Sequence, residues 1–269
     1  MEVRDKVFVV TGGGNGIGRE LVLGLVSKGA RVSAVDIRQE SLDETAALAG
    51  AGERVHTSVA DVTDREATAA LPQKVIAALG AVDGLINNAG IIQPFVKFND
   101  LDFAAIEKVV NVNLYGTVNM CKAFLPYLLE RPVAHLANVS SMGGFLPVPG
   151  QAVYGATKAA VKLLTEGLYA ELLDTGVGVS VIMPGAVGTN ITENSGVDIP
   201  AGAAQSAEES NIRTTSPAEA ARIIIDGIED DQLHIFVGSD SLMMNVAVRL
   251  SPKRSTHLIQ KRMKGLLEG

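Results

Sequence analysis

Short apolar segments alternate along the chain with longer segments whose apolar residues recur at helical spacing. The short segments predict seven strands, at residues 6–10, 31–35, 55–59, 84–86, 135–139, 178–183 and 234–237. Six longer segments predict helices, at residues 18–28, 39–49, 65–79, 103–129, 152–174 and 217–228. Because the strand segments are apolar on both faces of the pleat, each strand is expected to be covered by helices on both sides. The pattern predicts an α/β fold with a doubly wound, mostly parallel sheet of about seven strands.

Composition narrows the class of protein. No linker rich in Pro, Gly and Ser divides the 269 residues, so we expect a single domain over 1–269. The 47% apolar content suffices for a core, and the net charge of −7 disfavours nucleic acid as a partner. One cysteine excludes an intramolecular disulfide and a cysteine-based metal cage, and no metal is expected. No stretch resembles a signal peptide or a membrane span, which predicts a cytoplasmic protein.

A glycine-rich turn follows the first predicted strand and leads directly into the first predicted helix. It reads Thr-Gly-Gly-Gly-Asn-Gly-Ile-Gly over residues 11–18. The free N–H groups at the start of such a helix favour a pyrophosphate, and glycines let it approach the backbone. Asp36 ends the second strand, where a carboxylate can accept hydrogen bonds from both hydroxyls of an adenosine ribose.

A second candidate site is formed by Tyr154 and Lys158, four positions apart on a predicted helix. At this spacing the two side chains project from one helix face. A free phenol with a pKa near 10 exchanges protons poorly at neutral pH. A nearby ammonium favours the phenolate, and we therefore expect Lys158 to lower the pKa of Tyr154 and make it a usable acid or base.

These motifs, taken in order, resemble those of the short-chain dehydrogenase/reductase family in its single-domain form. The resemblance runs from about residue 6 to residue 237. It includes Gly12-x-x-x-Gly16-x-Gly18, Asp61-Val62, Asn87-Asn88-Ala89-Gly90, Asn113, Ser141, Tyr154-x-x-x-Lys158, Pro184-Gly185 and Thr189. It implies a Rossmann-type fold and an oxidoreductase that acts on CH–OH groups with a nicotinamide cofactor.

The resemblance assigns cofactor-binding roles to residues along the chain. They are Gly12, Asn15, Gly16, Ile17, Gly18, Asp36, Asp61, Val62, Asn88, Ala89, Gly90, Tyr154, Lys158, Pro184, Gly185, Val187 and Thr189. Asp36 would repel a 2′-phosphate, and Asn15 occupies a position that is commonly basic in NADP-preferring relatives. NAD is therefore favoured, although Arg38, two residues beyond Asp36, keeps NADP as an alternative.

The same resemblance implies a catalytic set of Asn113, Ser141, Tyr154 and Lys158. Ser141 would donate a hydrogen bond to the substrate oxygen as negative charge develops on it. Ser140 is chemically equivalent, and only the family's spacing to the tyrosine selects Ser141. Asn113 would help to hold a water against Lys158; Asn111 matches this role less well.

Function is expected to be hydride transfer between NAD and a secondary alcohol or ketone, the substrate being small and hydrophobic. Residues 186–216 would form a lid over an apolar pocket, facing Phe145, Leu146, Val148 and Pro149, with Phe95 nearby. Alternatives are an NADP-dependent carbonyl or 3-oxoacyl reductase and, from another class, a non-catalytic dinucleotide sensor. The substrate, the physiological direction and the exact oligomer cannot be read from the residues.

Other features are expected to be structural. The four histidines, His56, His135, His234 and His257, share no metal-binding spacing, and Cys121 is expected in the core. The resemblance implies a homo-oligomer, a tetramer or dimer, through helices 103–129 and 152–174. The helical tail, about residues 240–269, contains an amphipathic helix over 251–269 that is expected to pack on protein, with a membrane-surface role less favoured.

Overall fold

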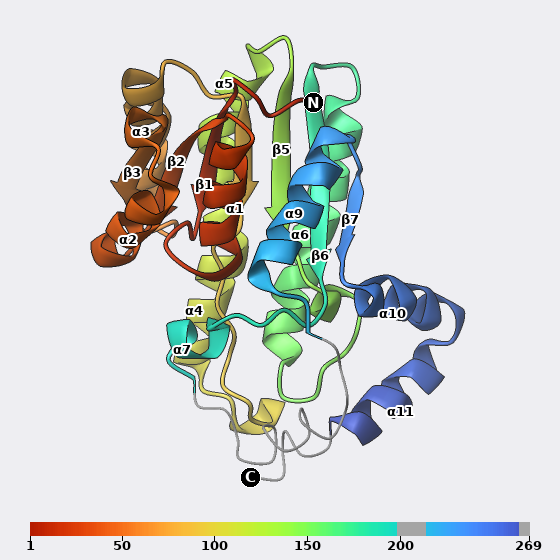
Figure 1. Cartoon of the computed structure of the whole chain (residues 1–269). Helices are drawn as coiled ribbons and strands as arrows, with labels where there is room; N and C mark the ends of the chain where they lie inside the picture. Colours follow the sequence, from red (N-terminus) through yellow and green to blue (C-terminus); the bar gives the residue numbers. More distant parts are fainter. Residues whose placement is uncertain (198–213, 264–269) are drawn as a thin grey trace.

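Seven parallel strands form one sheet in the order β3-β2-β1-β4-β5-β6-β7 (Figure 1). In this computed structural model, residues 1–197 and 214–263 are described. The strands are β1 (Val7–Thr11), β2 (Arg31–Asp36), β3 (Val55–Val59), β4 (Gly84–Asn87), β5 (Ala134–Val139), β6 (Val177–Pro184) and β7 (His234–Val237). The seven predicted strands are confirmed to within two residues at their ends, and so is their parallel arrangement.

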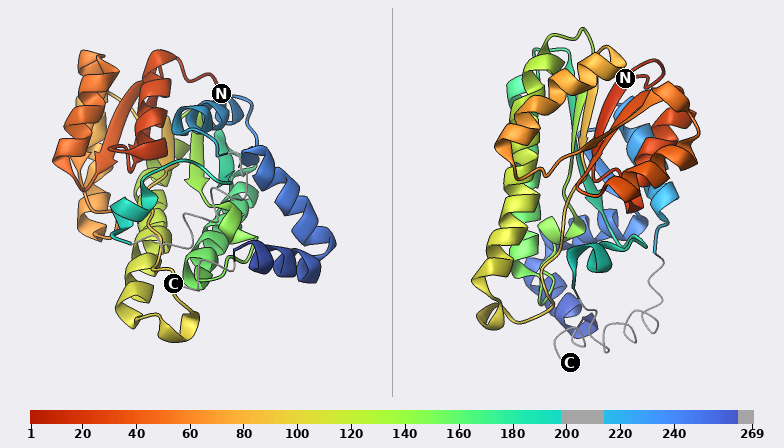
Figure 2. Two further views of the ribbon diagram at one scale, coloured as in Figure 1. Left: turned by 60° about the horizontal axis from the view of Figure 1, so that its bottom comes forward. Right: turned by 90° about the vertical axis from the view of Figure 1, so that its left-hand side faces the viewer.

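Helices cover both faces of the sheet, as the apolar strands require. On one face lie α1 (Gly16–Ser27), α2 (Gln39–Ala49) and α9 (Pro217–Glu229), and their apolar residues form one core cluster with the sheet. On the other face lie α3 (Arg65–Leu79), α4 (Phe103–Val110), α5 (Thr117–Leu129) and α6 (Ala152–Leu172), around a second cluster. Figure 2 shows the two helical layers on either side of the sheet. The fold is the predicted doubly wound, Rossmann-type arrangement.

One strand prediction and one helix prediction need correction. The third strand is not apolar on both faces: it lies at the sheet edge, and His56, Thr57 and Ser58 are only half-buried. The helix predicted over 103–129 is interrupted, because residues Asn111–Gly116 form a π-helical turn between α4 and α5. A wider turn barely changes the spacing of apolar residues, so the interruption leaves little trace in the hydrophobic pattern.

Two of the residues expected to be structural, His135 and Cys121, lie in the core, whereas His257 is exposed on the surface. His135 on β5 is buried and shares a hydrogen bond of 2.9 Å with Ser180, and burial lowers its pKa to about 3. Cys121 is buried on α5, where burial raises the pKa of its thiol to about 12. Cys121 therefore lacks the thiolate character that a reactive cysteine needs.

The C-terminal segment forms two helices rather than one. α10 (Ser239–Leu250) follows β7, and α11 (Pro252–Arg262) begins after a break at Ser251. Met244 of α10 and Ile259 of α11 pack against Leu146, which we expected in the substrate pocket. Leu146 is instead buried beneath these helices, because their inward apolar side chains need a partner surface. Over 1–197 and 214–263, no helix is long and apolar enough to cross a membrane.

The carboxyl ends of all strands meet at one edge of the sheet, at the bottom of Figure 1. The chain reverses its direction of winding between β1 and β4, which are neighbours in the sheet. In open α/β sheets a crevice for ligands forms outside the strand ends at such a switch point. The predicted glycine-rich turn follows β1, and Asn88 follows β4, so both reach this crevice.

Candidate functional site

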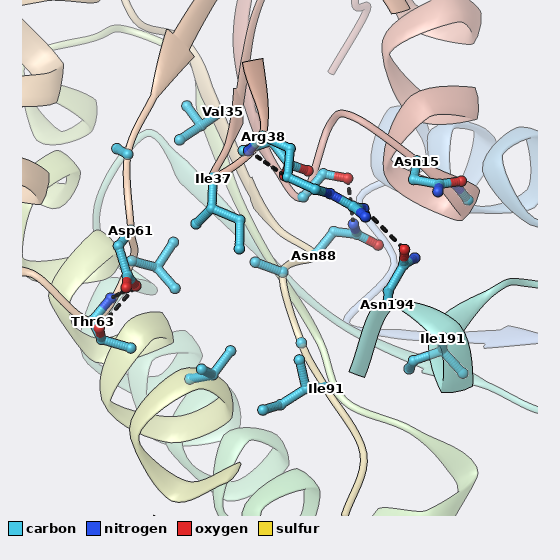
Figure 3. Close-up of a pocket in the computed structure, with 18 of the residues that line it drawn as sticks. Asn15, Val35, Ile37, Arg38, Asp61, Thr63, Asn88, Ile91, Ile191 and Asn194 are labelled. Carbon is cyan, nitrogen blue, oxygen red and sulfur yellow. Dashed lines mark hydrogen bonds between the residues drawn. The ribbon is translucent and has the colours of Figure 1, made fainter. Parts of the chain in front are cut away.

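A pocket of about 490 Å³ lies at the switch point (Figure 3). Eleven of the predicted cofactor-binding residues line it: Gly12, Asn15, Gly16, Ile17, Asp36, Asp61, Val62, Asn88, Ala89, Gly90 and Thr189. Gly18, Tyr154, Lys158, Pro184, Gly185 and Val187 were also predicted but are not among the lining residues. The pocket thus gathers side chains from turns spread over more than half of the chain.

The glycine-rich turn is shaped by close backbone packing. Gly12 and Gly16 have φ of +65° and +53°, a conformation that favours glycine. Gly18 lies on α1 against the turn itself: a Cβ there would stand 2.0 Å from the carbonyl oxygen of Gly12. Gly18 therefore allows the helix to approach the strand exit, while Gly12 and Gly16 face the pocket.

Asn88 fixes the position of this turn relative to β4. Its side-chain Nδ2 donates to the carbonyl oxygen of Thr11 at 3.0 Å, and its backbone N–H donates to Thr11 Oγ1 at 3.0 Å. Ala89 N–H donates to the same hydroxyl at 3.0 Å. These three bonds hold the ends of β1 and β4 together at the point where the pocket opens.

Asp36 lies at the pocket rim at the end of β2. Its carboxylate accepts hydrogen bonds from Gly14 N–H at 3.1 Å and from Arg38 N–H at 3.2 Å. The carboxylate keeps lone pairs for further donors, as binding of ribose hydroxyls requires. Arg38 donates from its guanidinium to Asn194 Oδ1 at 2.9 Å, so it joins the β2 exit to the short helix α7 (Ile191–Ser195).

Tyr154 and Ser141 meet around Gly143. A Cβ at Gly143 would lie 3.3 Å from the Tyr154 ring and 3.4 Å from Ser141 Oγ. Ser141 Oγ accepts a hydrogen bond from Gly143 N–H at 3.0 Å, which leaves its own proton available for donation. Ser140 is engaged elsewhere: it is buried and donates to the carbonyl oxygen of Lys158 at 2.7 Å. This geometry favours Ser141 over Ser140 as the candidate donor.

The pKa of Tyr154 shifts in the direction opposite to our expectation. Burial raises it above the ordinary value of a phenol, and the hydrogen bond with Ser141 acts the other way. Lys158 Nζ lies 5.9 Å from the centroid of the tyrosine ring and donates its hydrogen bond to the carbonyl oxygen of Val139. The protein alone therefore favours the neutral phenol, and a positively charged nicotinamide would be needed beside it to favour the phenolate.

The ammonium group of Lys158 is buried and held by a backbone carbonyl group. It is 4% exposed, and its Nζ donates to the carbonyl oxygen of Val139 at 3.0 Å. Burial lowers its pKa to about 8. A Cβ at Gly90 would lie 3.1 Å from Nζ, so the glycine of the Asn-Asn-Ala-Gly turn provides room for the ammonium group.

Asn113 lies in the π-helical turn, fully buried. Its Oδ1 accepts from Ile91 N–H at 2.9 Å, and its Nδ2 donates to Ile91 O at 2.9 Å and to Thr157 Oγ1 at 3.1 Å. The side chain thus joins the β4 exit to α6, which carries Tyr154 and Lys158. Asn111, the weaker match, instead lines the pocket.

Gln93 was not singled out from the sequence. It is fully buried after β4, and its Oε1 accepts hydrogen bonds from Val153 N–H at 2.8 Å and Tyr154 N–H at 2.9 Å. Its Nε2 donates to Gly150 O at 2.9 Å, and Gln151 Nε2 donates back to its carbonyl oxygen at 2.8 Å. The first turn of α6 has no side-chain cap of its own. Gln93 satisfies these otherwise unpaired N–H groups from a distant segment.

Only part of the expected lid can be placed. Residues 186–197 and 214–216 are described, and the rest of 186–216 lies outside the described residues. Ser195 of α7 accepts a hydrogen bond from Ile92 N–H at 3.0 Å, and Val187 pairs with Thr215 in a parallel bridge. Phe95 and Phe145 are half-buried, and Phe145 packs against the cluster of Leu146, Met244 and Ile259. Within the described ranges, no three His, Cys, Asp or Glu side chains gather where they could hold a metal ion.

The pocket fits a dinucleotide in its chemistry. The N-terminus of α1 with its glycines suits a pyrophosphate, and Asp36 suits a ribose. Gly90 and Ile91 line the end of the pocket closest to Lys158, while Thr189 lies beside Gly16. The end of the pocket formed by Gly90 therefore lies beside the ammonium group of Lys158.

Comparisons with known proteins agree with this geometry. The model of the short chain dehydrogenase family matches residues 6–199. The oxidoreductase SadH of Mycobacterium tuberculosis is 36% identical over 250 residues, which cover 91% of this chain and 90% of SadH. A short-chain dehydrogenase/reductase from Burkholderia phymatum, solved with NAD, superposes with a TM-score of 0.83 at 27% identity, covering 94% of this chain and 95% of its own.

Levodione reductase superposes with a TM-score of 0.81 at 29% identity, covering 89% of this chain and 98% of its own. The match with the family model extends from β1 past β6, and so includes the glycine-rich turn, Ser141, Tyr154 and Lys158. Its extent, the full-length relative and the superpositions all lead to one assignment. The chain belongs to the short-chain dehydrogenase family of NAD(P)-linked oxidoreductases.

Proposed function

We propose that this protein oxidises a hydrophobic secondary alcohol to a ketone with NAD, or reduces the ketone in the reverse direction. The observation that carries the proposal is the meeting of Ser141 and Tyr154 around Gly143, with Lys158 buried behind them. A non-catalytic dinucleotide sensor would need the glycine-rich turn but not this group of side chains.

NAD, when bound, accepts the hydride from the carbon that carries the hydroxyl. Tyr154 takes the hydroxyl proton, and Ser141 donates a hydrogen bond to the substrate oxygen. Lys158, when protonated, favours the phenolate form of Tyr154 electrostatically. Asn113 positions α6 against the β4 exit and is proposed to help hold a water beside Lys158. The products are the ketone, NADH and one proton, so charge and atoms balance.

NAD rather than NADP is proposed because the Asp36 carboxylate lies at the ribose end of the pocket. It would accept hydrogen bonds from the ribose hydroxyls and repel a 2′-phosphate. A specific observation keeps the NADP-dependent reductase as a second candidate: Arg38 lines the same pocket. Among the described residues, its guanidinium makes one hydrogen bond, to Asn194.

The direct test follows nicotinamide absorbance with NAD and with NADP over steroid, cyclic, aliphatic and sugar alcohols. We expect turnover with NAD on apolar secondary alcohols. The motivation is the apolar segment that follows Ser141, in which Phe145 is half-buried. Activity confined to sugar phosphates or carboxylates would contradict the proposal of an apolar substrate. No turnover with any alcohol or ketone would contradict the proposal that the protein is an enzyme.

Gln93 provides a test of how the catalytic helix is positioned. Gln93→Met keeps the volume but removes the acceptor for Val153 and Tyr154 N–H, so the start of α6 should shift. We expect kcat to fall by roughly tenfold or more, since a small misplacement of a reacting group is costly. KM for NAD should change little, because Gln93 does not line the pocket.

The matched variant is Gln93→Glu, which retains the acceptor for the two N–H groups. It should recover part of the lost kcat if that acceptor is what positions Tyr154. Equal kcat in wild type and Gln93→Met, at equal folded content by circular dichroism, would rule out the positioning role.

A homo-oligomer through α4, α5 and α6 is also proposed, by resemblance to the family. Phe103 at the start of α4 and Leu163 on α6 are 78% and 71% exposed. Apolar side chains of this size on neighbouring helices suit a contact with a second copy. Light scattering after size-exclusion chromatography would give the number of subunits.

A further inference from the structure

Helix α10 carries large apolar side chains on its outward face as well as on its inward face. Leu242, Met243, Val246 and Leu250 lie on its outward face, with exposures from 49% for Val246 to 81% for Leu250. The inward face buries Ser241 and Asn245 beside Met244. A helix on the surface of a water-soluble fold normally turns its apolar side chains to the core. Four large apolar side chains on one outward face indicate a surface that contacts something other than water.

The exposed positions of α10 and α11 also carry positive charge. Between Ser239 and Met263 there are five basic side chains, Arg249, Lys253, Arg254, Lys261 and Arg262, all exposed. Arg249 follows Leu242 by seven positions and so lies on the same side of α10. The single acidic residue of the segment, Asp240, is turned inward, where its Oδ2 accepts a hydrogen bond from Ala186 N–H at 2.9 Å. The C-terminal helices are therefore basic in a chain whose net charge is −7.

We propose that α10 and α11 form a docking surface for an anionic lipid bilayer. Apolar side chains would enter the interface between headgroups and acyl chains, and the basic side chains would contact the headgroups. This combination of an apolar stripe with flanking Lys and Arg is what a peripheral, non-spanning membrane contact needs. In Figures 1 and 2 both helices project beyond β7, away from the sheet.

A second copy of the chain fits this surface less well. A two-fold contact places the same patch on both subunits. The basic side chains of one α10–α11 pair would then face those of the other, without acidic partners within the segment. The exposed apolar residues of α4 and α6 supply a separate face for self-association.

The inward sides of α10 and α11 pack on the segment that follows Ser141. Met244 and Ile259, on the inward sides of the two helices, pack with Leu146, and Met142 and Phe145 pack against the same cluster. These residues follow Ser141 directly in the chain. A bilayer contact would thus place the segment beside Ser141 and Tyr154 close to a reservoir of apolar molecules. The docking surface itself does not depend on the reaction proposed above.

The experiment is co-sedimentation of the full chain with two kinds of vesicle, phosphatidylcholine alone and phosphatidylcholine mixed with phosphatidylglycerol. We expect binding to the mixed vesicles and at least tenfold weaker binding to phosphatidylcholine alone. Raising the salt concentration should release the protein, because the screening length falls from about 10 Å at 0.1 M to about 3 Å at 1 M ionic strength.

Two multiple variants separate the apolar contribution to vesicle binding from the electrostatic contribution. Leu242→Gln/Val246→Gln/Leu250→Gln and Lys253→Gln/Arg254→Gln should each weaken binding to mixed vesicles by roughly tenfold or more. All five positions are exposed, so folding should be retained, and circular dichroism checks this.

The matched control is Leu48→Gln/Leu129→Gln/Val133→Gln, which removes three exposed apolar side chains elsewhere on the surface. It should bind mixed vesicles like the wild type. Equal loss in this control, or no binding of wild type to either vesicle, would overturn the proposal. If the α10 variant instead lowered the oligomeric state by light scattering without any vesicle binding, the face would belong to a subunit contact.

Discussion

Replacing Tyr154 with phenylalanine is expected to remove most of the turnover while leaving NAD binding nearly intact. The substitution deletes the hydroxyl that exchanges the proton but keeps the ring that packs beside Gly143. General acid–base groups contribute about 10²- to 10⁴-fold to rate, and kcat should fall by that factor. The measurements are kcat on the best alcohol and the affinity for NADH from its fluorescence, which is uncomplicated here because the chain has no tryptophan.

Tyr169→Phe is the matched control, since Tyr169 lies on the same helix with its side chain 38% exposed. It should leave both quantities unchanged. A Tyr154→Phe variant that retained more than a tenth of wild-type kcat would refute the assignment of Tyr154.

The pH dependence of this step has a defined sign. Alcohol oxidation needs the phenolate, so the rate should rise with pH as Tyr154 loses its proton. Burial raises the pKa of Tyr154 and thus moves this rise to higher pH, whereas a bound oxidised nicotinamide moves it lower. Lys158, whose pKa burial lowers to about 8, supports the phenolate only below that pH, where it carries its charge.

Those parts of the fold that depend on local residue chemistry could be predicted from the sequence. α3 begins and ends where it was expected because Asp64 caps it, accepting from Glu66 and Ala67 N–H, and Gly80 ends it with φ of +87°. The doubly wound, parallel arrangement of the sheet followed from the alternation of strands and helices. The helix ends depend on residues within a few positions of each other, and the sheet arrangement depends on a pattern repeated along the chain.

Contacts between distant segments could not be predicted in this way. Gln93 caps α6 across a separation of 60 residues, and a glutamine after a turn has no distinguishing local pattern. Leu146 was expected to face substrate because its segment follows Ser141; its burial beneath α10 and α11 depends on helices a hundred residues later. The outward position of Leu242, Val246 and Leu250 on α10 could not be predicted either, because periodicity detects an apolar stripe but not the side of the helix on which the fold lies.

The second large effect is expected at Asp36, where Asp36→Ala should narrow or reverse the preference for NAD. The change removes an acceptor for the ribose hydroxyls and the charge that repels a 2′-phosphate. A hydrogen bond to a charged group is worth about 1.5–3 kcal/mol, so the ratio of kcat/KM for NAD to that for NADP should fall by roughly 10- to 100-fold. Both values are measured with the same alcohol.

Asp36→Ala also removes the acceptor of Gly14 N–H and Arg38 N–H, which could loosen the glycine-rich turn for both cofactors. Asp36→Asn separates these effects, because its one amide oxygen keeps an acceptor for one of the two N–H groups but the side chain carries no charge. If charge sets the preference, Asp36→Asn should shift the ratio in the same direction as Asp36→Ala, with a smaller loss of kcat/KM for NAD. Asp43→Ala removes an equal charge from α2 outside the pocket and should leave the ratio unchanged.

Arg38 is expected to bind NADP more strongly in Asp36→Ala. It already lines the pocket, and its guanidinium would attract a 2′-phosphate once the carboxylate is gone. Adding Arg38→Leu to Asp36→Ala should therefore cancel most of the gain in kcat/KM for NADP. If the ratio of kcat/KM for NAD to that for NADP stays constant in all of these variants, then Asp36 and Arg38 do not bind the adenosine ribose or its 2′-phosphate. That result would overturn the proposed preference for NAD.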